Sequence, residues 1–181
     1  SDQPSIDLDK DDSVHIAWRD YYSYPYPKIY YAKLDNKGNI ILTNVRVSSE
    51  NNLLASFPSI SVDNNGYAHI AYNDLIPPGD VDPQVYYSKV IGDDIELNIR
   101  ISESIGATGR PDVAVDNNDG IHIVWSEEKE IYNGDDEYYL YYSKLDSNGN
   151  ILVDNRKISE VKELTINPAV VAADKVHVIW K

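Results

Sequence analysis

Apolar and polar residues alternate at a period of two in a sequence motif that occurs four times along this 181-residue chain. The copies begin at Pro4, Pro58, Pro111 and Pro168. In each copy the first run passes through a turn into a second run of β-branched and aromatic residues, as at residues 5–9 and 14–18. Such alternation is typical of β-strands with two different faces. The motif therefore predicts two antiparallel strands at the start of each unit.

A second pair of strands is predicted in the other half of each complete unit. A strand built on a Tyr-Tyr motif begins this half, at residues 29–34, 85–90 and 140–145. A turn follows, and then a strand that ends in the pattern Asn-x-Arg/Lys-x-Ser. Because no stretch shows a sustained apolar period of 3.6 residues, almost no helix is expected.

Four antiparallel strands in a recurring unit predict an all-β fold of β-propeller blades. The anchor prolines stand 54, 53 and 57 residues apart. A β-trefoil would end after three copies, and a β-sandwich does not require such self-similarity. The expected propeller arc spans residues 1–181. It divides into blades at 1–57, 58–110 and 111–167, with 168–181 as the first two strands of a fourth blade.

Two motifs carry a resemblance to a known group of proteins. The His-Ile-Ala-Trp strand at 15–18 and the Tyr-Tyr-Ser-Lys-Leu-Asp strand at 141–146 resemble the propeller repeats of secreted archaeal and bacterial surface proteins, within the sialidase-like group. The resemblance implies a propeller fold and an extracellular or cell-surface location. The Asp-box of sialidases is not intact, because residues 143–151 keep its Asp and Gly at a different spacing. This departure counts against sialidase activity.

The net charge of the chain limits the classes of partner that it can bind. It has 16 Lys and Arg against 30 Asp and Glu, a formal net charge of −14. Such a surface repels phosphate backbones, so no nucleic-acid partner is expected. There is no apolar run near 18 residues, so no membrane span is expected. Protein or glycan partners remain, and calcium is the one cofactor that the acidic turns suggest.

The four histidines hold the same repeat position. They are His15, His69, His122 and His177. One histidine per unit places each on a different sheet, which favours a structural role over a shared catalytic or metal site. Four aromatic residues fall on the opposite strand face and are expected to pack between blades. They are Trp18, Tyr72, Trp125 and Trp180.

An acidic residue recurs two positions after the aromatic residue that ends the second strand. The three are Asp20, Asp74 and Glu127. They could form a ring of carboxylates, and paired carboxylates are what glycoside hydrolysis needs. The recurring Lys33, Lys89 and Lys144 on the adjacent strand favour salt bridges within each blade instead.

Two kinds of loop offer binding groups. The turn at residues 116–120 makes Asp116 and Asp119 the candidate calcium ligands, although such a sequence is also an ordinary turn. The link between the second and third strands differs in each unit, and variable loops commonly carry function. In the first unit it holds four candidate ligand-binding tyrosines, which could equally pack on a neighbouring blade. They are Tyr21, Tyr22, Tyr24 and Tyr26.

These patterns favour a non-catalytic binding or structural module of a secreted or surface protein that recognises protein or glycan. The candidate residues recur as scaffold positions, and the sequence shows no unrepeated acid–base pair. Both observations favour that interpretation over an enzyme. The alternative is a carbohydrate-active enzyme whose site needs the complete ring. A third is self-assembly, because a half blade leaves apolar faces and a free edge at Trp180. Further chain, which we favour, or a second copy would complete the ring.

Overall fold

The computed structural model describes residues 1–21, 26–78, 82–103, 106–129, 137–159 and 167–181. The first sheet contains β1 (Asp2–Leu8), β2 (Val14–Asp20), β3 (Lys28–Leu34) and β4 (Ile40–Arg46). The second contains β5 (Ser56–Val62), β6 (Ala68–Asp74), β7 (Gln84–Ile91) and β8 (Asp94–Arg100). The third contains β9 (Asp112–Val115), β10 (Ile121–Lys129), β11 (Glu137–Leu145) and β12 (Ile151–Lys157). A two-stranded sheet of β13 (Ala169–Ala172) and β14 (Val176–Ile179) ends the chain.

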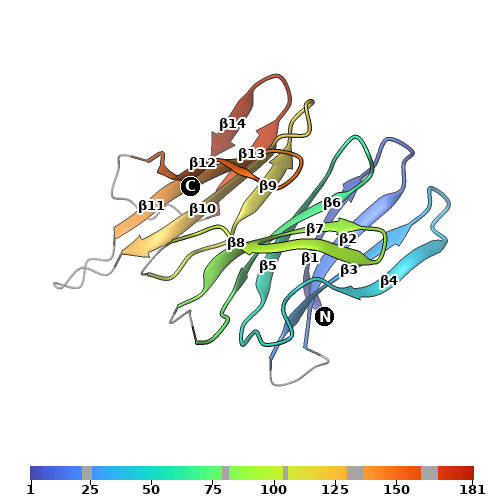
Figure 1. Ribbon diagram of the computed structural model, residues 1–181, viewed down its shortest axis with the longest axis horizontal. Helices are drawn as coiled ribbons and strands as arrows, with labels where there is room; N and C mark the ends of the chain where they lie inside the picture. Colours follow the sequence, from blue (N-terminus) through green and yellow to red (C-terminus); the bar gives the residue numbers. More distant parts are fainter. Residues whose placement is uncertain (22–25, 79–81, 104–105, 130–136, 160–166) are drawn as a thin grey trace.

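Each four-stranded sheet is an antiparallel meander in chain order, and the first strand of each sheet packs beside the first strand of the next. Figure 1 shows the sheets following one another in an arc, from β1–β4 at one end to β13–β14 at the other. This radial arrangement of four-stranded sheets confirms the predicted fold class, a β-propeller with three complete blades and a half blade. The strands therefore lie where the period-two pattern places them. In the part of the chain that the structure describes, no helix is long and apolar enough to cross a membrane.

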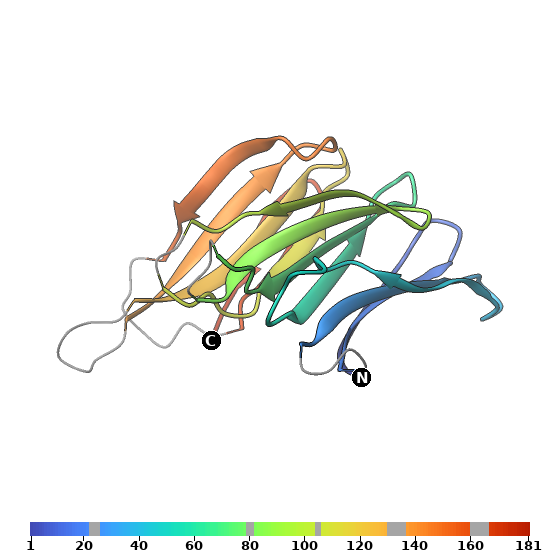
Figure 2. The ribbon, with the colours of Figure 1, turned by 60° about the horizontal axis from the view of Figure 1, so that its bottom comes forward.

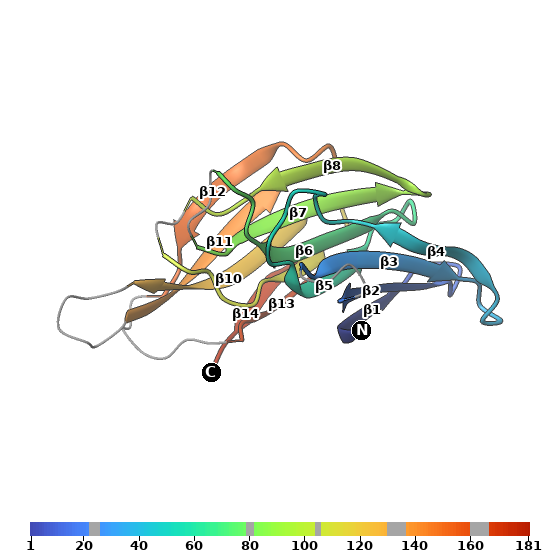
Figure 3. The same cartoon turned by 90° about the horizontal axis from the view of Figure 1, so that it is seen from below.

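The sheets fan out from their first strands. Figure 2 shows the three four-stranded sheets layered face against face. In Figure 3, β8 and β12 lie along the upper edge, and β1, β5 and β13 lie toward the lower edge. The inner strands β1, β5, β9 and β13 therefore surround the axis of the arc, and β4, β8 and β12 lie farthest from it.

The hydrophobic core consists of the layers between neighbouring sheets. In the layer between the first two sheets, Ala17 and Tyr31 pack with Ile60, Ile70 and Tyr72. The layer between the second and third sheets repeats this arrangement one unit later. Its members include Ala71, Tyr87, Val113, Ile123 and Trp125. The predicted packing of Trp125 between blades is thus confirmed, because its side chain is fully buried there.

The two ends of the arc lack such a covering layer in the described residues. Ile6 is 64% exposed, whereas Ile60, its equivalent in the next sheet, is 6% exposed. At the other end, Ile179 is 69% exposed. Because each sheet can bury only the face that a neighbour covers, the same repeat position is core in the middle of the arc and surface at its end.

Hydrogen bonds also join the inner strands to one another. Ser5 Oγ accepts from the backbone N of Ile60 (3.2 Å), and Ser59 Oγ accepts from the backbone N of Val113 (3.2 Å). The polar positions of the inner strands thus satisfy backbone donors of the next sheet. Their alternation with apolar residues reflects contacts between blades as well as exposure to solvent.

Candidate functional site

The recurring histidine of each complete blade joins a buried chain of polar groups. In the first sheet, His15 Nε2 lies 3.2 Å from Asp9 Oδ2, and His15 Nδ1 lies 2.9 Å from the Tyr31 hydroxyl. Because an ionised carboxylate only accepts, Nε2 carries the proton and Nδ1 accepts from Tyr31. Lys33 Nζ donates to the same Asp9 oxygen at 2.9 Å.

The third sheet repeats this chain and the second keeps most of it. His122 bonds Asp116 (2.9 Å) and Tyr142 (2.8 Å). His69 bonds the Tyr87 hydroxyl at 2.7 Å, and its Nε2 lies 3.3 Å from Asp63 Oδ2. Each histidine thus serves its own blade, which agrees with the structural role expected from the repeat.

The lysine positions correct one expectation. Lys33 stands opposite His15 in the β2–β3 register, whereas Asp20 stands opposite Lys28 at the far end of the strand. Lys144 likewise bonds Asp116, at 3.3 Å. The predicted pairing of these lysines with the acids that end the second strand is therefore wrong. Five residues of strand separate Lys28 from Lys33, a distance of about 16 Å.

The three recurring acids do not share one substrate-binding surface. Asp74 is fully buried at the end of β6. Burial raises its pKa to about 6, and Asn52, the backbone N of Leu75 and Lys28 partly offset that effect. A raised pKa is what a general acid requires, but no substrate can reach this carboxyl group. Lys28 is buried beside it and donates to backbone carbonyls, including that of Glu50 at 2.9 Å.

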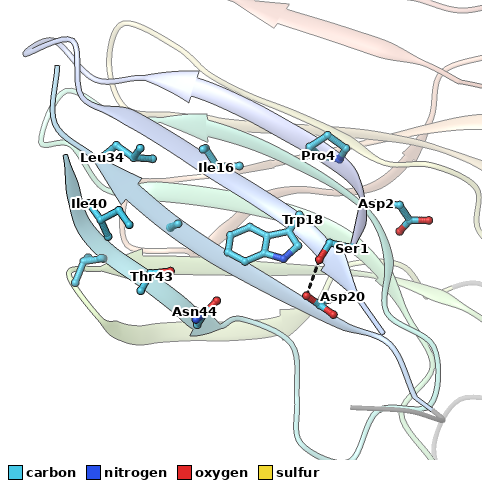
Figure 4. A pocket seen from close by; sticks show the side chains of 12 residues that line it. Ser1, Asp2, Pro4, Ile16, Trp18, Asp20, Leu34, Ile40, Thr43 and Asn44 are labelled. Carbon is cyan, nitrogen blue, oxygen red and sulfur yellow. Dashed lines mark hydrogen bonds between the residues drawn. The ribbon is translucent and has the colours of Figure 1, made fainter. Parts of the chain in front are cut away.

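Asp20 faces a different cavity, of about 520 Å³, on the uncovered face of the first sheet. Figure 4 shows Ile16, Trp18 and Leu34 along its apolar floor, with the Ser1 hydroxyl donating to Asp20 Oδ2 (2.7 Å) at one end. Blades cover the equivalent face of the second and third sheets, so this cavity marks the end of the arc. Glu127 is half-buried, and its backbone pairs with that of Thr108.

The tyrosine cluster is only partly described. Tyr21 is exposed, and the Arg19 guanidinium lies 4.8 Å from its ring centroid. Tyr26 is exposed as well. Tyr22 and Tyr24 lie outside the described residues. The ligand-binding role of these four tyrosines stays a prediction.

The two candidate calcium ligands are engaged in other bonds. Asp116 Oδ1 accepts from the backbone N of Asn118 and Gly120, each at 2.8 Å. Asp119 Oδ1 accepts from the backbone N of Asn64 in the neighbouring blade at 3.0 Å. Among the described residues, no group of three His, Asp or Glu side chains could hold a metal ion. The calcium hypothesis stays a prediction.

A pocket of about 420 Å³ opens where the inner strands begin. Its rim carries the four residues that precede the anchor prolines. They are Gln3, Phe57, Arg110 and Asn167. Three of them have positive φ angles of 51° to 57°. The pairing register shifts at Gln3 and Phe57, between Asp2 and Ser5 and between Ser56 and Ser59, so this conformation belongs to a recurring irregularity of the first strand that turns these side chains toward the pocket. This axial pocket is our candidate functional site.

The wall of the axial pocket holds one carboxylate that the repeat does not demand. Asp112 replaces the serine found at the equivalent positions Ser5 and Ser59. Its Oδ2 accepts from the backbone N of Val170 at 2.8 Å, and its Oδ1 accepts from the Ser59 hydroxyl at 2.5 Å. A hydroxyl forms the corresponding bond between the other blades, so the carboxylate adds a charge that this bond does not require.

The sequence pattern does not reveal this pocket, because the residues that distinguish it neither recur in the repeat nor lie in the longest loops. A signal was present in the recurring motif itself. Its proline is invariant, but the residue before it is an amide, an aromatic residue or an arginine according to the copy, and Asp112 follows the third proline. Variation at one position of a strict repeat, at the axis where all blades meet, is what a binding site requires.

The geometry defines the chain as an arc of a β-propeller, and solved structures agree. No protein-family model and no curated protein matches the sequence. The endo-arabinase of Bacteroides thetaiotaomicron is similar over 99% of this chain and 70% of its own, with a TM-score of 0.63 and 12% identity. The α-L-arabinanase of Penicillium chrysogenum, complexed with arabinobiose, is similar over 93% and 54%, with a TM-score of 0.68 and 13% identity.

A third similar structure is a polysaccharide lyase of family PL25, an ulvan lyase bound to a GlcA–Rha3S saccharide. The similarity covers 98% of this chain and 48% of the lyase, with a TM-score of 0.61 and 13% identity. This chain thus spans about half to seven tenths of these proteins. The likeness establishes the propeller fold, and the sialidase-like resemblance stays a prediction.

These neighbours correct the functional expectation. The repeat favours a non-catalytic module and disfavours an enzyme. The similar structures are glycoside hydrolases and polysaccharide lyases, which contradicts that preference. Recurring scaffold residues explain the fold, but they do not decide whether a fold carries an active site.

Proposed function

We propose that this chain is a carbohydrate-active enzyme, or the part of one that carries the saccharide site. One observation carries the proposal: the axial pocket gathers two amides, an aromatic residue, an arginine and one unrepeated carboxylate on an otherwise repeated scaffold. The fold shared with arabinanases and a polysaccharide lyase supports it. An extracellular or cell-surface location follows as part of the proposal, since polysaccharide substrates are found there.

Asp112 would be the carboxylate that faces the substrate. It is half-buried at the pocket wall, and two donors hold it in place. Such a group can bind sugar hydroxyls, accept a proton from water or stabilise positive charge at the anomeric carbon. Glycoside hydrolysis uses a pair of carboxyl groups separated by roughly 5 to 9.5 Å. Asp112 is the one acid among the described residues that line this pocket, so hydrolysis here requires a second from elsewhere.

The test compares the 181-residue protein with two variants on arabinan and on ulvan. New reducing ends report hydrolysis, and ultraviolet absorbance of unsaturated products reports elimination. Asp112→Asn keeps the size of the side chain, and Asp112→Ser installs the residue of the equivalent positions and preserves a bond to Val170. We expect both variants to unfold at nearly the wild-type urea concentration and to lose at least about a hundredfold in turnover.

Two outcomes would contradict the proposal. One is wild-type turnover in Asp112→Ser, which would show that the carboxylate serves only to join the blades. The other is the absence of both turnover and saccharide binding by the wild-type protein on both substrates.

A further inference from the structure

Arg110 differs from the paired arginines of this acidic chain. Arg19 bonds Asp2 twice, at 2.8 and 2.6 Å, and Arg46 pairs with Glu50 at 3.2 Å. Within the described residues, Arg110 donates no hydrogen bond and forms no ion pair. Arg110 is exposed, so water can satisfy its donors and they are open to a ligand that enters the axial pocket.

The contact that Arg110 does make leaves its hydrogen-bond donors available. Its Cζ lies 4.7 Å from the ring centroid of Phe57, which precedes the equivalent proline of the neighbouring blade. A guanidinium stacked on an aromatic face is held flat, and its N–H groups point outward from the edge. This edge matches a planar carboxylate, which accepts two parallel hydrogen bonds.

The nearby acid does not neutralise Arg110. Asp112 is two residues along the same chain, but its oxygens accept from Ser59 and Val170. Phe57 is itself held in place, because its backbone N donates a hydrogen bond to Gln3 Oε1 at 2.7 Å. The pocket therefore offers a fixed cation with open donors beside a fixed carboxylate.

We propose that the axial pocket takes a sugar that bears a carboxylate, a uronic acid residue, and that Arg110 binds this carboxylate through two hydrogen bonds. The proposal rests on the carbohydrate-active function proposed above and names its substrate class. The Gln3 amide nitrogen and the Asn167 amide lie on the same rim and provide donors for sugar hydroxyls. The pocket volume of about 420 Å³ lies within the range of small-molecule sites.

The test measures binding by titration calorimetry with three probes. The first is a short uronic acid oligosaccharide, the second is the same oligosaccharide after reduction of its carboxyl groups to alcohols, and the third is that neutral oligosaccharide with sulfate esters. We expect the carboxylate form to bind at least about tenfold more tightly than the reduced form. Its affinity falls with added salt, whereas that of the reduced form does not.

Variants at the same position assign the preference. Arg110→Gln installs the residue type of the equivalent position, Gln3, and is expected to bind the carboxylate and reduced forms equally. Arg110→Lys keeps the charge without the planar edge and is expected to retain part of the preference. Phe57→Leu removes the stacking surface and is expected to reduce the preference without abolishing binding.

Equal affinity of the wild-type protein for the carboxylate and reduced forms overturns this inference, as does an unchanged preference in Arg110→Gln. Tighter binding of the sulfate form than of the carboxylate form also overturns it. Turnover of a neutral polysaccharide that depends on Asp112 would leave the proposed function standing in each of these cases. If none of the probes binds and no polysaccharide is cleaved, both proposals fail.

Discussion

At the residue scale, the burial of Asp74 makes it a source of instability at neutral pH. Its pKa of about 6 in the folded protein exceeds the pKa of 3.8 of an unperturbed aspartate. Between these values the folded state binds a proton that the unfolded state has lost, so this group lowers stability as pH rises through that window. We expect Asp74→Asn to raise the free energy of unfolding at pH 7.5 by on the order of 2–3 kcal/mol.

The same variant contains its own control. Asparagine can still accept from the backbone N of Leu75, which now bonds Asp74 Oδ1 at 2.8 Å. Near pH 3.5 the wild-type carboxyl group is protonated in the folded state and mostly protonated in the unfolded state, so the gain should fall there to roughly a few tenths of a kcal/mol at most. Urea unfolding at the two pH values measures it. A gain that is independent of pH would show that the charge of Asp74 is not what costs stability.

Residue roles were predictable from the sequence only where the repeat itself assigns them. His15 and His122 were expected to be structural because they recur once per blade, and their bonds within single blades agree. The partners of Lys33 were not predictable, because strand register decides whether a lysine meets the turn acid or the acid at the other strand end. Asp112 could not be singled out from the sequence, because only the assembled blades bring it to the pocket wall beside Arg110.

At the scale of the element, the turn at residues 116–120 links stability to pH. Burial lowers the pKa of His122, although its bond to Asp116 opposes this effect. Burial alone would raise the pKa of Asp116, but bonds from His122, Gly120, Asn118 and Lys144 outweigh it and hold that pKa below its usual range. The folded state thus keeps His122 neutral and Asp116 charged near neutral pH.

We therefore expect acid to lower the free energy of unfolding through the protonation of His122. Below about pH 6.5 the unfolded histidine takes up a proton that folded His122 refuses, so stability falls as pH falls. His122→Gln removes this proton uptake. The difference in free energy of unfolding between wild type and variant should shrink between pH 7.5 and pH 5, as measured in urea. A difference that grows toward pH 5 would contradict the buried, neutral state of His122.

A matched pair of positions tests the layers between sheets. Ile60 and Ile6 hold the same repeat position, at 6% and 64% exposure. Ile60→Ala should cost about 2–5 kcal/mol because it leaves a cavity in a covered layer. Ile6→Ala should cost less than about 0.5 kcal/mol, as surface substitutions do. Urea unfolding of both variants gives the comparison, and an equal cost would mean that another surface covers β1 in solution.

At the scale of the whole molecule, the propeller was predictable because the four-strand unit occurs in three complete copies and one half copy along the sequence. A period of two, a turn and a recurring proline suffice to place every strand that the structure describes. The axial pocket did not follow from the same pattern. It exists because blades meet at their first strands, and only the assembled arc brings the residues before Pro4, Pro58, Pro111 and Pro168 to one rim.

The unequal covering of the sheets predicts unequal local stability along the arc. Stability in repeat architectures is approximately a sum of units and of the interfaces between neighbours. The second sheet is covered on both faces, with β6 fully buried, whereas the half sheet of β13 and β14 is exposed at Val171 and Ile179. Native-state hydrogen exchange should therefore show the slowest amides in β6 and β7 and the fastest in β14. Protection of β14 equal to that of β6 in dilute protein would show that the arc is not stabilised unit by unit. Protection of β14 that rises with protein concentration would instead locate a contact between copies at that end. An equal cost of Ile6→Ala and Ile60→Ala would then indicate that β1 of the second copy forms the other half of this contact.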